Sequence, residues 1–325
     1  MLFSIVILLL GFVLLIKGAD CLIEGSVSLA KRLKVSDLVI GLTIVSLGTS
    51  APELIVSTVA AWNGKGDLSI GNIVGSNIAN LMLILGVSAV IRPLVVKRNT
   101  AHKEIPFSFL AAATLFILGN DILFGGGIAN VLTSGDGLIL MSFFTIFLFY
   151  SFATAKSEEG VVKEAKEESS EAKAHGLPLT WLMIGGGLVA LSLGGRWVVS
   201  GATDIAAAIG LSEKLIGLTI VAIGTSLPEL FASAVAARKG NSDIAIGNVV
   251  GSNIFNIFWI LGAASLIKSL NFNPAMNFDI GYLLAVTALM PVLIYVGKKR
   301  VLDKWEGSFL VSAYLAYICY LIIRG

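Results

Sequence analysis

An internal repeat is the feature of this chain that most constrains its fold. Residues 39–86 recur at 215–262 with a constant offset of 176 and no gap, and 30 of the 48 aligned residues are identical. Each copy keeps one glutamate, Glu53 or Glu229, inside an otherwise apolar run. A carboxylate within the hydrocarbon of a bilayer costs roughly 2.5–3.5 kcal/mol on insertion scales. Two such residues at matching positions indicate a cation site built between the two repeats.

The composition is that of a membrane protein. Of the 325 residues, 56% are hydrophobic and only 14% are charged, whereas soluble domains have about 25% charged residues. The apolar runs approach the ~20 residues that a spanning helix needs and lack the ~10-residue alternation of barrel strands. The fold class predicted is therefore an all-α polytopic membrane protein. Cys21 and Cys319 lie in apolar segments, and we expect both to be buried as small hydrophobic residues.

The apolar runs predict ten transmembrane helices arranged as two inverted five-helix repeats. These spans are expected near 2–28, 38–62, 69–91, 104–120, 136–153, 178–206, 214–237, 245–267, 278–297 and 307–323. Because five is an odd number, the second repeat must enter the membrane from the opposite side, as in many secondary transporters. The chain then divides into a first repeat (1–153), a charged loop (154–177) and a second repeat (178–325). This loop is expected to be a solvated helix or a disordered tether.

The distribution of basic residues predicts the orientation in the membrane. If the N-terminus is outside, the inner loops hold 17 Lys and Arg residues and the outer segments hold 4. The positive-inside rule therefore places both termini outside and the charged loop in the cytoplasm. The protein is expected in the cell (inner or plasma) membrane as a multi-pass protein, with lipid as its surroundings. No nucleic acid and no obligate protein partner is indicated.

The first motif of each repeat combines a helix-breaking proline with the glutamate. It reads GTSAPE at 48–53 and GTSLPE at 224–229. Pro52 and Pro228 have no N–H, so each frees a main-chain carbonyl one turn earlier in its helix. Freed carbonyls, hydroxyl groups and a carboxylate are hard oxygen donors, which suit Ca²⁺, Na⁺ or Mg²⁺. The alternative interpretation is a simple proline kink with a glutamate that is protonated or reaches the membrane surface.

The second motif of each repeat places polar residues on one helix face. It reads GNIVGSNIAN at 71–80 and GNVVGSNIFN at 247–256. Ser76 and Asn80 are four residues apart and share a face, as do Ser252 and Asn256. These pairs are expected either to bind cations or only to form hydrogen bonds between helices. In the same motif, Asn77 and Asn253 point elsewhere and are expected to hold helices together.

The paired motifs GTSxPEL and IGNxxGSNIxN resemble the repeats of sodium/calcium exchangers, within the cation/calcium antiporter superfamily. The resemblance covers the whole ten-span layout, and the short central loop is typical of a prokaryotic member. It implies that spans 2, 3, 7 and 8 form the cation sites. It makes Glu53 and Glu229 the main Ca²⁺ ligands, which also serve Na⁺. The other implied metal ligands are the carbonyls of Thr49 and Thr225, the hydroxyls of Ser50, Ser226, Ser76 and Ser252, and the side chains of Asn80 and Asn256, with carbonyls at Ser46 and Ala222 as weaker matches.

The same resemblance implies that spans 1 and 6 form a mobile pair that slides past a fixed core. Asp20 and Arg196 are equivalent by the 176-residue offset and carry opposite charges. They are expected either to extend to the membrane surface separately or to form an ion pair between the two helices. Some relatives carry Asp where this chain has Asn256, including potassium-dependent ones, which argues against potassium co-transport.

The resemblance implies Na⁺/Ca²⁺ antiport by alternating access, with Ca²⁺ and Na⁺ as transported ions and no cofactor. The chain has no GxxxxGK[ST] motif for a nucleotide. Alternatives are a Ca²⁺/H⁺ or other cation antiporter of the same superfamily and, at greater distance, a cation channel. An enzyme is not expected, because HExxH is absent and the two histidines, His102 and His175, fall in predicted cytoplasmic loops.

Overall fold

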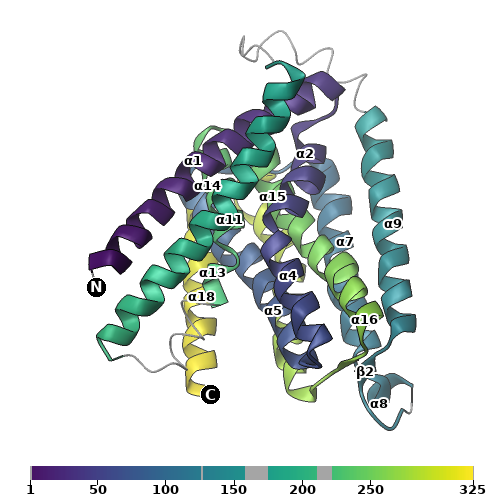
Figure 1. Cartoon of the computed structure of the whole chain (residues 1–325). Coiled ribbons are helices and arrows are strands. Elements are labelled where there is room, and N and C mark those ends of the chain that lie inside the picture. The colour runs from purple at the N-terminus through teal and green to yellow at the C-terminus, as the bar shows by residue number, and fades with distance from the viewer. Residues whose placement is uncertain (1, 126, 158–174, 211–221, 325) are drawn as a thin grey trace.

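Long apolar helices make up most of the structure, a computed structural model that describes residues 2–125, 127–157, 175–210 and 222–324 (Figure 1). Eight helical stretches in these ranges are long and apolar enough to cross a membrane, and a bent pair of helices gives a ninth. The prediction of a helical membrane protein is therefore confirmed. The seventh predicted span, 214–237, lies partly outside the described residues, so the number of ten helices stays a prediction.

The secondary structure follows the repeat in both halves of the chain. The first half contains α1 (Leu2–Leu33), α2 (Asp37–Ile40), η1 (Gly41–Val45), α3 (Ser46–Thr49), α4 (Ala51–Trp62), α5 (Gly66–Ala79), η2 (Asn80–Ile84), α6 (Leu85–Ile91), β1 (Leu94–Val95), η3 (Thr100–Glu104), α7 (Ile105–Leu118), α8 (Asp121–Phe124), β2 (Val131–Leu132) and α9 (Ser134–Ser157). The second half contains α11 (Leu177–Ala208), α13 (Ala222–Gly224), α14 (Leu227–Arg238), α15 (Ser242–Phe255), η6 (Asn256–Leu261), α16 (Gly262–Ile267), β3 (Leu270–Asn271), η7 (Pro274–Met276), α17 (Asn277–Val296), β4 (Val301–Leu302) and α18 (Lys304–Arg324).

The helices α1 and α11 cross the face of the bundle side by side and antiparallel (Figure 1). Glycines line their contact, where the two backbones nearly touch. A Cβ atom on Gly187 would lie 2.7 Å from the carbonyl oxygen of Gly18, and one on Gly194 would lie 2.8 Å from that of Gly11. Such small residues allow close helix packing in a membrane, where apolar surface alone does not drive association. The two helices therefore form one tightly packed pair.

The proline motifs break their helices as the sequence predicts. The helical stretches Asp37–Thr49 and Ala51–Trp62 meet at an angle of 49°. Ser50 occupies the break, and Pro52 lies in the first turn of α4, where its missing N–H breaks no hydrogen bond within that helix. The second copy repeats this geometry, with Ser226 before α14 and Pro228 in its first turn.

The two glycine- and asparagine-rich spans lie at the centre of the bundle. In the apolar 18-residue window of Gly66–Ile91, 78% of the residues are buried in the protein, and in that of Ser242–Ile267 94% are, against 22–39% in the other six helices. Close backbone contact makes this possible: a Cβ atom on Gly251 would lie 2.6 Å from the carbonyl oxygen of Leu42. Both spans widen into a π-helical segment, η2 and η6, which begin at Asn80 and Asn256. Such widening is frequent at functional sites.

Two short antiparallel ribbons connect the halves of the chain, and the sequence did not predict them. In one, Leu94 pairs with Leu302, and in the other, Leu132 pairs with Leu270. All four of these leucines are buried. Each ribbon therefore ties a loop of the first half to a loop of the second.

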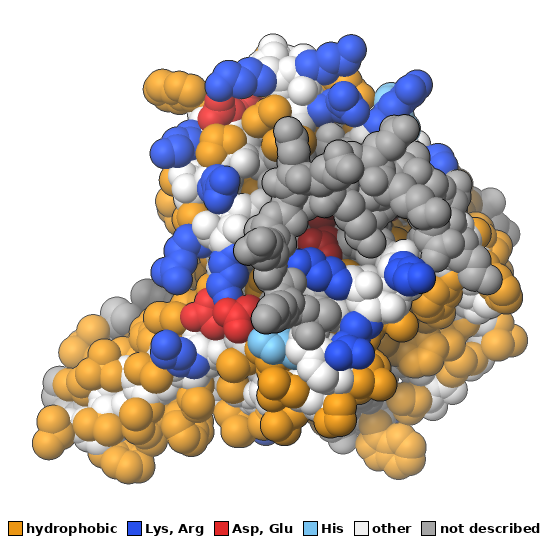
Figure 2. All heavy atoms as spheres, turned by 90° about the horizontal axis from the view of Figure 1, so that it is seen from above, with side chains coloured by type: hydrophobic (Ala, Val, Ile, Leu, Met, Phe, Trp, Pro, Cys, Tyr) orange, Lys and Arg blue, Asp and Glu red, His pale blue; other side chains and the backbone are white. Residues whose placement is uncertain are grey.

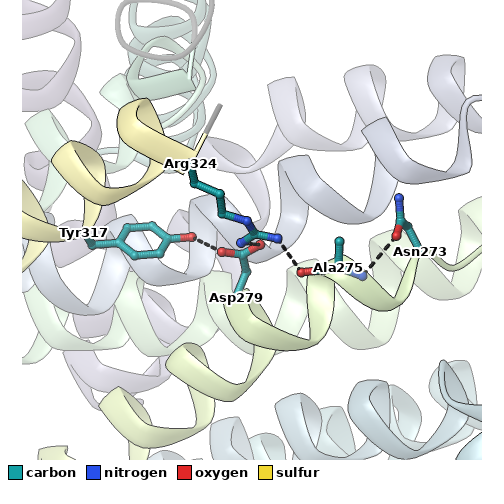
Figure 3. Close-up of polar contacts among 5 residues, drawn as sticks. All are labelled: Asn273, Ala275, Asp279, Tyr317 and Arg324. Carbon is teal, nitrogen blue, oxygen red and sulfur yellow. Dashed lines mark hydrogen bonds and ion pairs between the residues drawn. The ribbon is translucent and has the colours of Figure 1, made fainter.

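The last helix is fastened to α17 by a polar cluster near the C-terminus (Figure 3). The carboxylate of Asp279 accepts a hydrogen bond from the Tyr317 hydroxyl at 2.9 Å and forms an ion pair with Arg324 at 3.4 Å. Arg324 also donates to the carbonyl oxygen of Ala275 at 2.7 Å. These contacts hold the last two turns of α18 against η7 and the start of α17.

Figure 2 shows the molecule from above. Lysine and arginine side chains gather on this upper face, and hydrophobic side chains lie toward the edges of the view. This is the face at which α9 ends and α11 begins, while both chain termini lie in the lower half of the view (Figure 1). The prediction for the two cysteines is wrong, because Cys21 and Cys319 are both exposed on their helices. In a membrane protein an apolar residue can face lipid instead of the protein interior.

An ion-pair cluster fastens α1 to the core at this upper face. The ammonium group of Lys239, just after α14, lies 3.1 Å from Asp20 and 2.9 Å from Glu24. The expected alternative in which Asp20 pairs with Arg196 is wrong, because Asp20 pairs with Lys239 instead. Burial alone lowers the pKa of Lys239, but its hydrogen bonds and ion pairs with Glu24 and Asp20 outweigh this and raise that pKa.

We expect Lys239→Met to destabilise the protein modestly, by roughly 0.5–1 kcal/mol, because all three charged groups are partly exposed and screened. Thermal unfolding in detergent at low and high salt measures this, and the loss should shrink at high salt. Because the folded pKa lies above the ordinary value of 10.5, the contribution is fully present below that pH and is lost only as pH rises through the folded pKa. It should therefore be constant between about pH 6 and 9.

The matched control is Lys298→Met, which removes a more exposed ion pair with Asp303 and should change stability less. An equal loss in both variants, or a loss from Lys239→Met that varies with pH in the neutral range, contradicts the assignment.

Candidate cation site

The predicted site residues come together where both broken helices meet α5 and α15. Glu53 and Glu229 are each 0% exposed. The other predicted residues are buried as well, except that Thr225 is half-buried. The buried set is Thr49, Ser50, Ser76, Asn80, Ser226, Ser252 and Asn256. The structure thus places all ten predicted residues in the interior of the bundle.

Each glutamate is bound by hydroxyl groups, and the bonds cross between the repeats. Ser50, from the first copy, donates to Oε1 of Glu229, from the second, at 3.0 Å. Glu53 accepts at 3.3 Å from Ser76 of its own repeat and also contacts Thr225 of the other. The two carboxyl groups repel each other electrostatically. The carboxylates therefore belong to one site.

Ser76 connects the two central spans. Its hydroxyl group accepts from Ser226 at 3.2 Å and from the Asn256 amide at 3.3 Å, and it donates to Glu53. One hydroxyl thereby joins α5, the start of η6 and the break before α14. This arrangement favours a shared polar centre over the alternative in which the Ser/Asn pairs only hold helices together.

Asn248 is a supporting residue that was not among the predicted ligands. Its amide donates to Ser233 at 2.9 Å and to the carbonyl oxygen of Glu229 at 3.3 Å, and its oxygen accepts from Thr49 at 3.0 Å. The equivalent residue, Asn72, donates to Ser57 at 3.0 Å. The shared position in both motifs is the signal that indicates this supporting role.

Several oxygen atoms in this centre have no hydrogen-bond partner although they are buried. They are Oε2 of Glu53, Oε2 of Glu229, Oδ1 of Asn80, Oδ1 of Asn256 and Oγ of Ser252. Buried polar atoms are nearly always satisfied in proteins, so a group of unsatisfied acceptors calls for a ligand. Ionised carboxylate and amide oxygens can only accept, so this group of atoms suits a hard cation as a candidate ligand.

The donor set is made of oxygen atoms with two formal charges. Among the described residues, no group of three or more His, Cys, Asp or Glu side chains lies together. None of the ion pairs formed by the described residues involves Glu53 or Glu229. Hard cations such as Ca²⁺ and Na⁺ prefer such oxygen ligands. Among the described residues the two glutamates thus have no ion-pair partner, and the donor set around them suits a hard cation.

A cavity of about 280 Å³ lies beside this centre, between α4, α11 and the break before α14. Pro52, Thr225 and Pro228 line it together with Arg196. It reaches the helix breaks of both repeats, and its wall on the other side belongs to α11. Arg196, whose role the sequence left open, thus lies on the wall of this cavity.

Comparison with known proteins gives consistent findings. The family model described as "Sodium/calcium exchanger protein" matches residues 3–153 and 179–323. The sodium/calcium exchanger MaX1 of Methanosarcina acetivorans is 31% identical over 97% of both chains. The inner membrane protein YrbG of Escherichia coli is 35% identical over 91% of this chain and 90% of its own. A solved structure of the sodium-calcium exchanger NCX_Mj superposes with a TM-score of 0.81 at 31% identity, covering 98% of each chain.

Proposed function

The chain belongs to the sodium/calcium exchanger protein family, and from that premise we propose that it exchanges Na⁺ for Ca²⁺ by alternating access. It is a multi-pass membrane protein, and the relatives that are named as exchangers are transporters and not enzymes. The cations are bound by the ten residues of the candidate site. One chain then supplies the whole site, with no cofactor.

The group of buried, unpartnered oxygens is the observation that carries this proposal. Two carboxylates neutralise one Ca²⁺, and the amide and hydroxyl oxygens complete its coordination, which takes about 6–8 oxygens. When the site is empty, its two negative charges are costly within the membrane. Exchange follows from this, because the site closes readily only with cations bound.

The contacts between the two halves support a site at the interface of inverted repeats. Asn77 donates to the carbonyl oxygen of Asn253, and Asn253 donates to that of Asn77, across the 176-residue offset. Reciprocal contacts between equivalent residues are those of a local two-fold axis. The pairing of β1 with β4, and of β2 with β3, likewise joins one repeat to the other.

The pair of α1 and α11 is suited to the moving part. Its two helices pack tightly on each other through glycines, so they can move as a unit. The cavity lined by Arg196 lies between α11 and the helix breaks, whereas Lys239 fastens α1 to the core at the face where α11 begins. A shift of this pair would change which side of the site is covered.

Ca²⁺ flux into reconstituted vesicles tests the function directly. We expect Ca²⁺ uptake driven by an outward Na⁺ gradient, saturating with Ca²⁺ and absent without Na⁺. Uptake driven equally well by a pH gradient without Na⁺ indicates a Ca²⁺/H⁺ exchanger. Flux that neither saturates nor needs a counter-ion indicates a channel.

The proposed topology makes a prediction about cysteine labelling. In a chain without Cys21 and Cys319, single cysteines at Lys34 and Lys239 should react with a membrane-impermeant thiol reagent only from the cytoplasm. A cysteine at Lys65 should react only from outside. The positive-inside rule predicts the side of the membrane for each of these three positions. Lys163, in the central loop, is also expected inside but lies outside the described residues. Reaction of the Lys34 and Lys239 positions from opposite sides refutes the inverted repeat.

A further inference from the structure

Two main-chain carbonyls fix the orientation of a cluster of four asparagines, Asn77, Asn80, Asn253 and Asn256. The side-chain nitrogen of Asn77 donates to the carbonyl oxygen of Asn253 at 3.0 Å, and that of Asn253 donates to the carbonyl oxygen of Asn77 at 3.2 Å. A main-chain carbonyl can only accept a hydrogen bond. Both amides must therefore present their NH₂ groups to these carbonyls, and neither is free to turn over.

The orientation of the other two asparagines follows from this. With their NH₂ groups occupied, Asn77 and Asn253 turn their side-chain oxygens toward the partner repeat. The Asn77 oxygen accepts from Nδ2 of Asn256 at 2.9 Å, and the Asn253 oxygen accepts from Nδ2 of Asn80 at 2.9 Å. An oxygen acceptor requires a donor opposite it, so Asn80 and Asn256 must use their NH₂ groups here. Their own oxygens then point away, buried and without a partner.

We infer that Asn77 and Asn253 are positioning residues, which turn the amide oxygens of Asn256 and Asn80 toward the transported cations. This inference rests on the proposed function and extends it. An asparagine amide presents either an oxygen or an NH₂ group, and the NH₂ group repels a cation. Each repeat thus orients the ligand of the other, Asn77 acting on Asn256 and Asn253 acting on Asn80.

This role differs from holding helices together. An aspartate in place of Asn256 or Asn80 has two oxygens and no NH₂ group, so it needs no orienting partner. Loss of Asn77 should therefore matter only while an amide occupies position 256. A role limited to helix packing gives no such dependence.

Binding of Ca²⁺ and of Na⁺ to the purified protein in detergent tests the inference, by isothermal titration with each cation separately. Removal of residues that orient a metal ligand typically weakens binding by about 10–100-fold. We expect Asn77→Leu, which leaves the Asn256 amide only its longer hydrogen bond to Ser76 at 3.3 Å, to weaken Ca²⁺ binding by at least about tenfold. Asn77→Asp loses the donor to the Asn253 carbonyl but keeps an acceptor for the Asn256 amide, so it should weaken binding less than Asn77→Leu. Elution as a single species and an unchanged unfolding temperature show that each variant is folded.

The decisive comparison is a rescue experiment with a control built into the repeat. Asn77→Leu combined with Asn256→Asp should bind at least as well as Asn256→Asp alone, because the Asn77 oxygen would otherwise face a carboxylate oxygen. Asn77→Leu combined with Asn80→Asp should stay impaired relative to Asn80→Asp alone, since Asn253 orients position 80. The mirror set with Asn253→Leu should reverse this pattern. Equal rescue by both aspartates, or wild-type binding by Asn77→Leu, overturns the inference.

The outcomes also separate this inference from the proposed function. If Asn256→Asp alone abolishes binding, the comparison of Asn77→Leu with Asn77→Asp decides, and equal loss in both overturns the inference. If the protein binds Ca²⁺ but shows no Na⁺-driven flux in vesicles, the proposed function fails while the binding results still judge the positioning role. If neither cation binds to the unmodified protein, the positioning role falls as well.

Discussion

Replacing Glu53 or Glu229 by glutamine is expected to abolish Ca²⁺ exchange, with a loss of at least about 100-fold, in a protein that remains folded. Two unit charges about 4 Å apart attract by about 4 kcal/mol at an effective dielectric constant of 20, and Ca²⁺ carries two charges. Even a third of the resulting attraction of about 8 kcal/mol, about 2.7 kcal/mol, corresponds to ~100-fold in affinity. Na⁺-dependent Ca²⁺ flux in vesicles measures the effect. Each glutamine should also relieve the repulsion between the two carboxyl groups, so unfolding temperature should not fall.

Glu104 provides a control matched in burial. It is a glutamate in a predicted span and only 1% exposed, but its carboxylate accepts from the Tyr150 hydroxyl at 2.6 Å and not from a hydroxyl group of the site. Glu104→Gln should therefore keep Ca²⁺ exchange close to that of the unmodified protein. Robust exchange in Glu53→Gln or Glu229→Gln would show that the cations bind elsewhere. Loss in all three variants would show that any buried glutamate is needed for structure alone.

The sequence could predict which residues come together because the repeat marks each of them twice. Glu53 and Glu229, the hydroxyl groups beside them and the asparagines of the second motif are all found at one centre. The spacing within a helix shows which residues share a face. It cannot show that Ser50 bonds to Glu229 and not to Glu53, because both copies carry the same residues and the choice depends on how the helices cross.

The roles of Asn77 and Asn253 show the same limit. Their position off the ligand face predicted contact between helices, and the structure confirms that contact. Their hold on the amides of Asn256 and Asn80 depends on the meeting of two helices from different repeats. No pattern within one repeat contains this information.

Contacts between distant loops and the exposure of apolar residues were also out of reach. Asp20 pairs with Lys239, 219 residues away, and not with its repeat equivalent. Strands of two residues, such as β1 and β4, are too short to show any alternation. Cys21 and Cys319 face outward since lipid is as apolar as the protein interior, so hydrophobicity predicts membrane depth but not burial.

An inside-negative membrane potential is expected to drive Ca²⁺ extrusion by this protein, because the Na⁺-loaded carrier should be charged. The ten site residues carry twelve side-chain oxygens, more than the 6–8 that one Ca²⁺ uses. The remainder suits additional monovalent ions, and the family resemblance implies about three Na⁺ for each Ca²⁺. Three Na⁺ on two carboxylates leave one positive charge, whereas one Ca²⁺ leaves none. Each cycle then moves one net charge.

The size of this effect makes it easy to measure. One elementary charge across 100 mV corresponds to about 2.3 kcal/mol, or a ~50-fold change in the Ca²⁺ ratio at equilibrium. Vesicles with equal Na⁺ on both sides, clamped by valinomycin and a K⁺ gradient, should therefore accumulate Ca²⁺ in the direction set by the potential. Vesicles containing Glu53→Gln should show no such accumulation, which separates exchange from leak. If the Ca²⁺ ratio does not change with the potential, two Na⁺ exchange for one Ca²⁺. The site oxygens that are not needed to coordinate Ca²⁺ would then bind no third Na⁺.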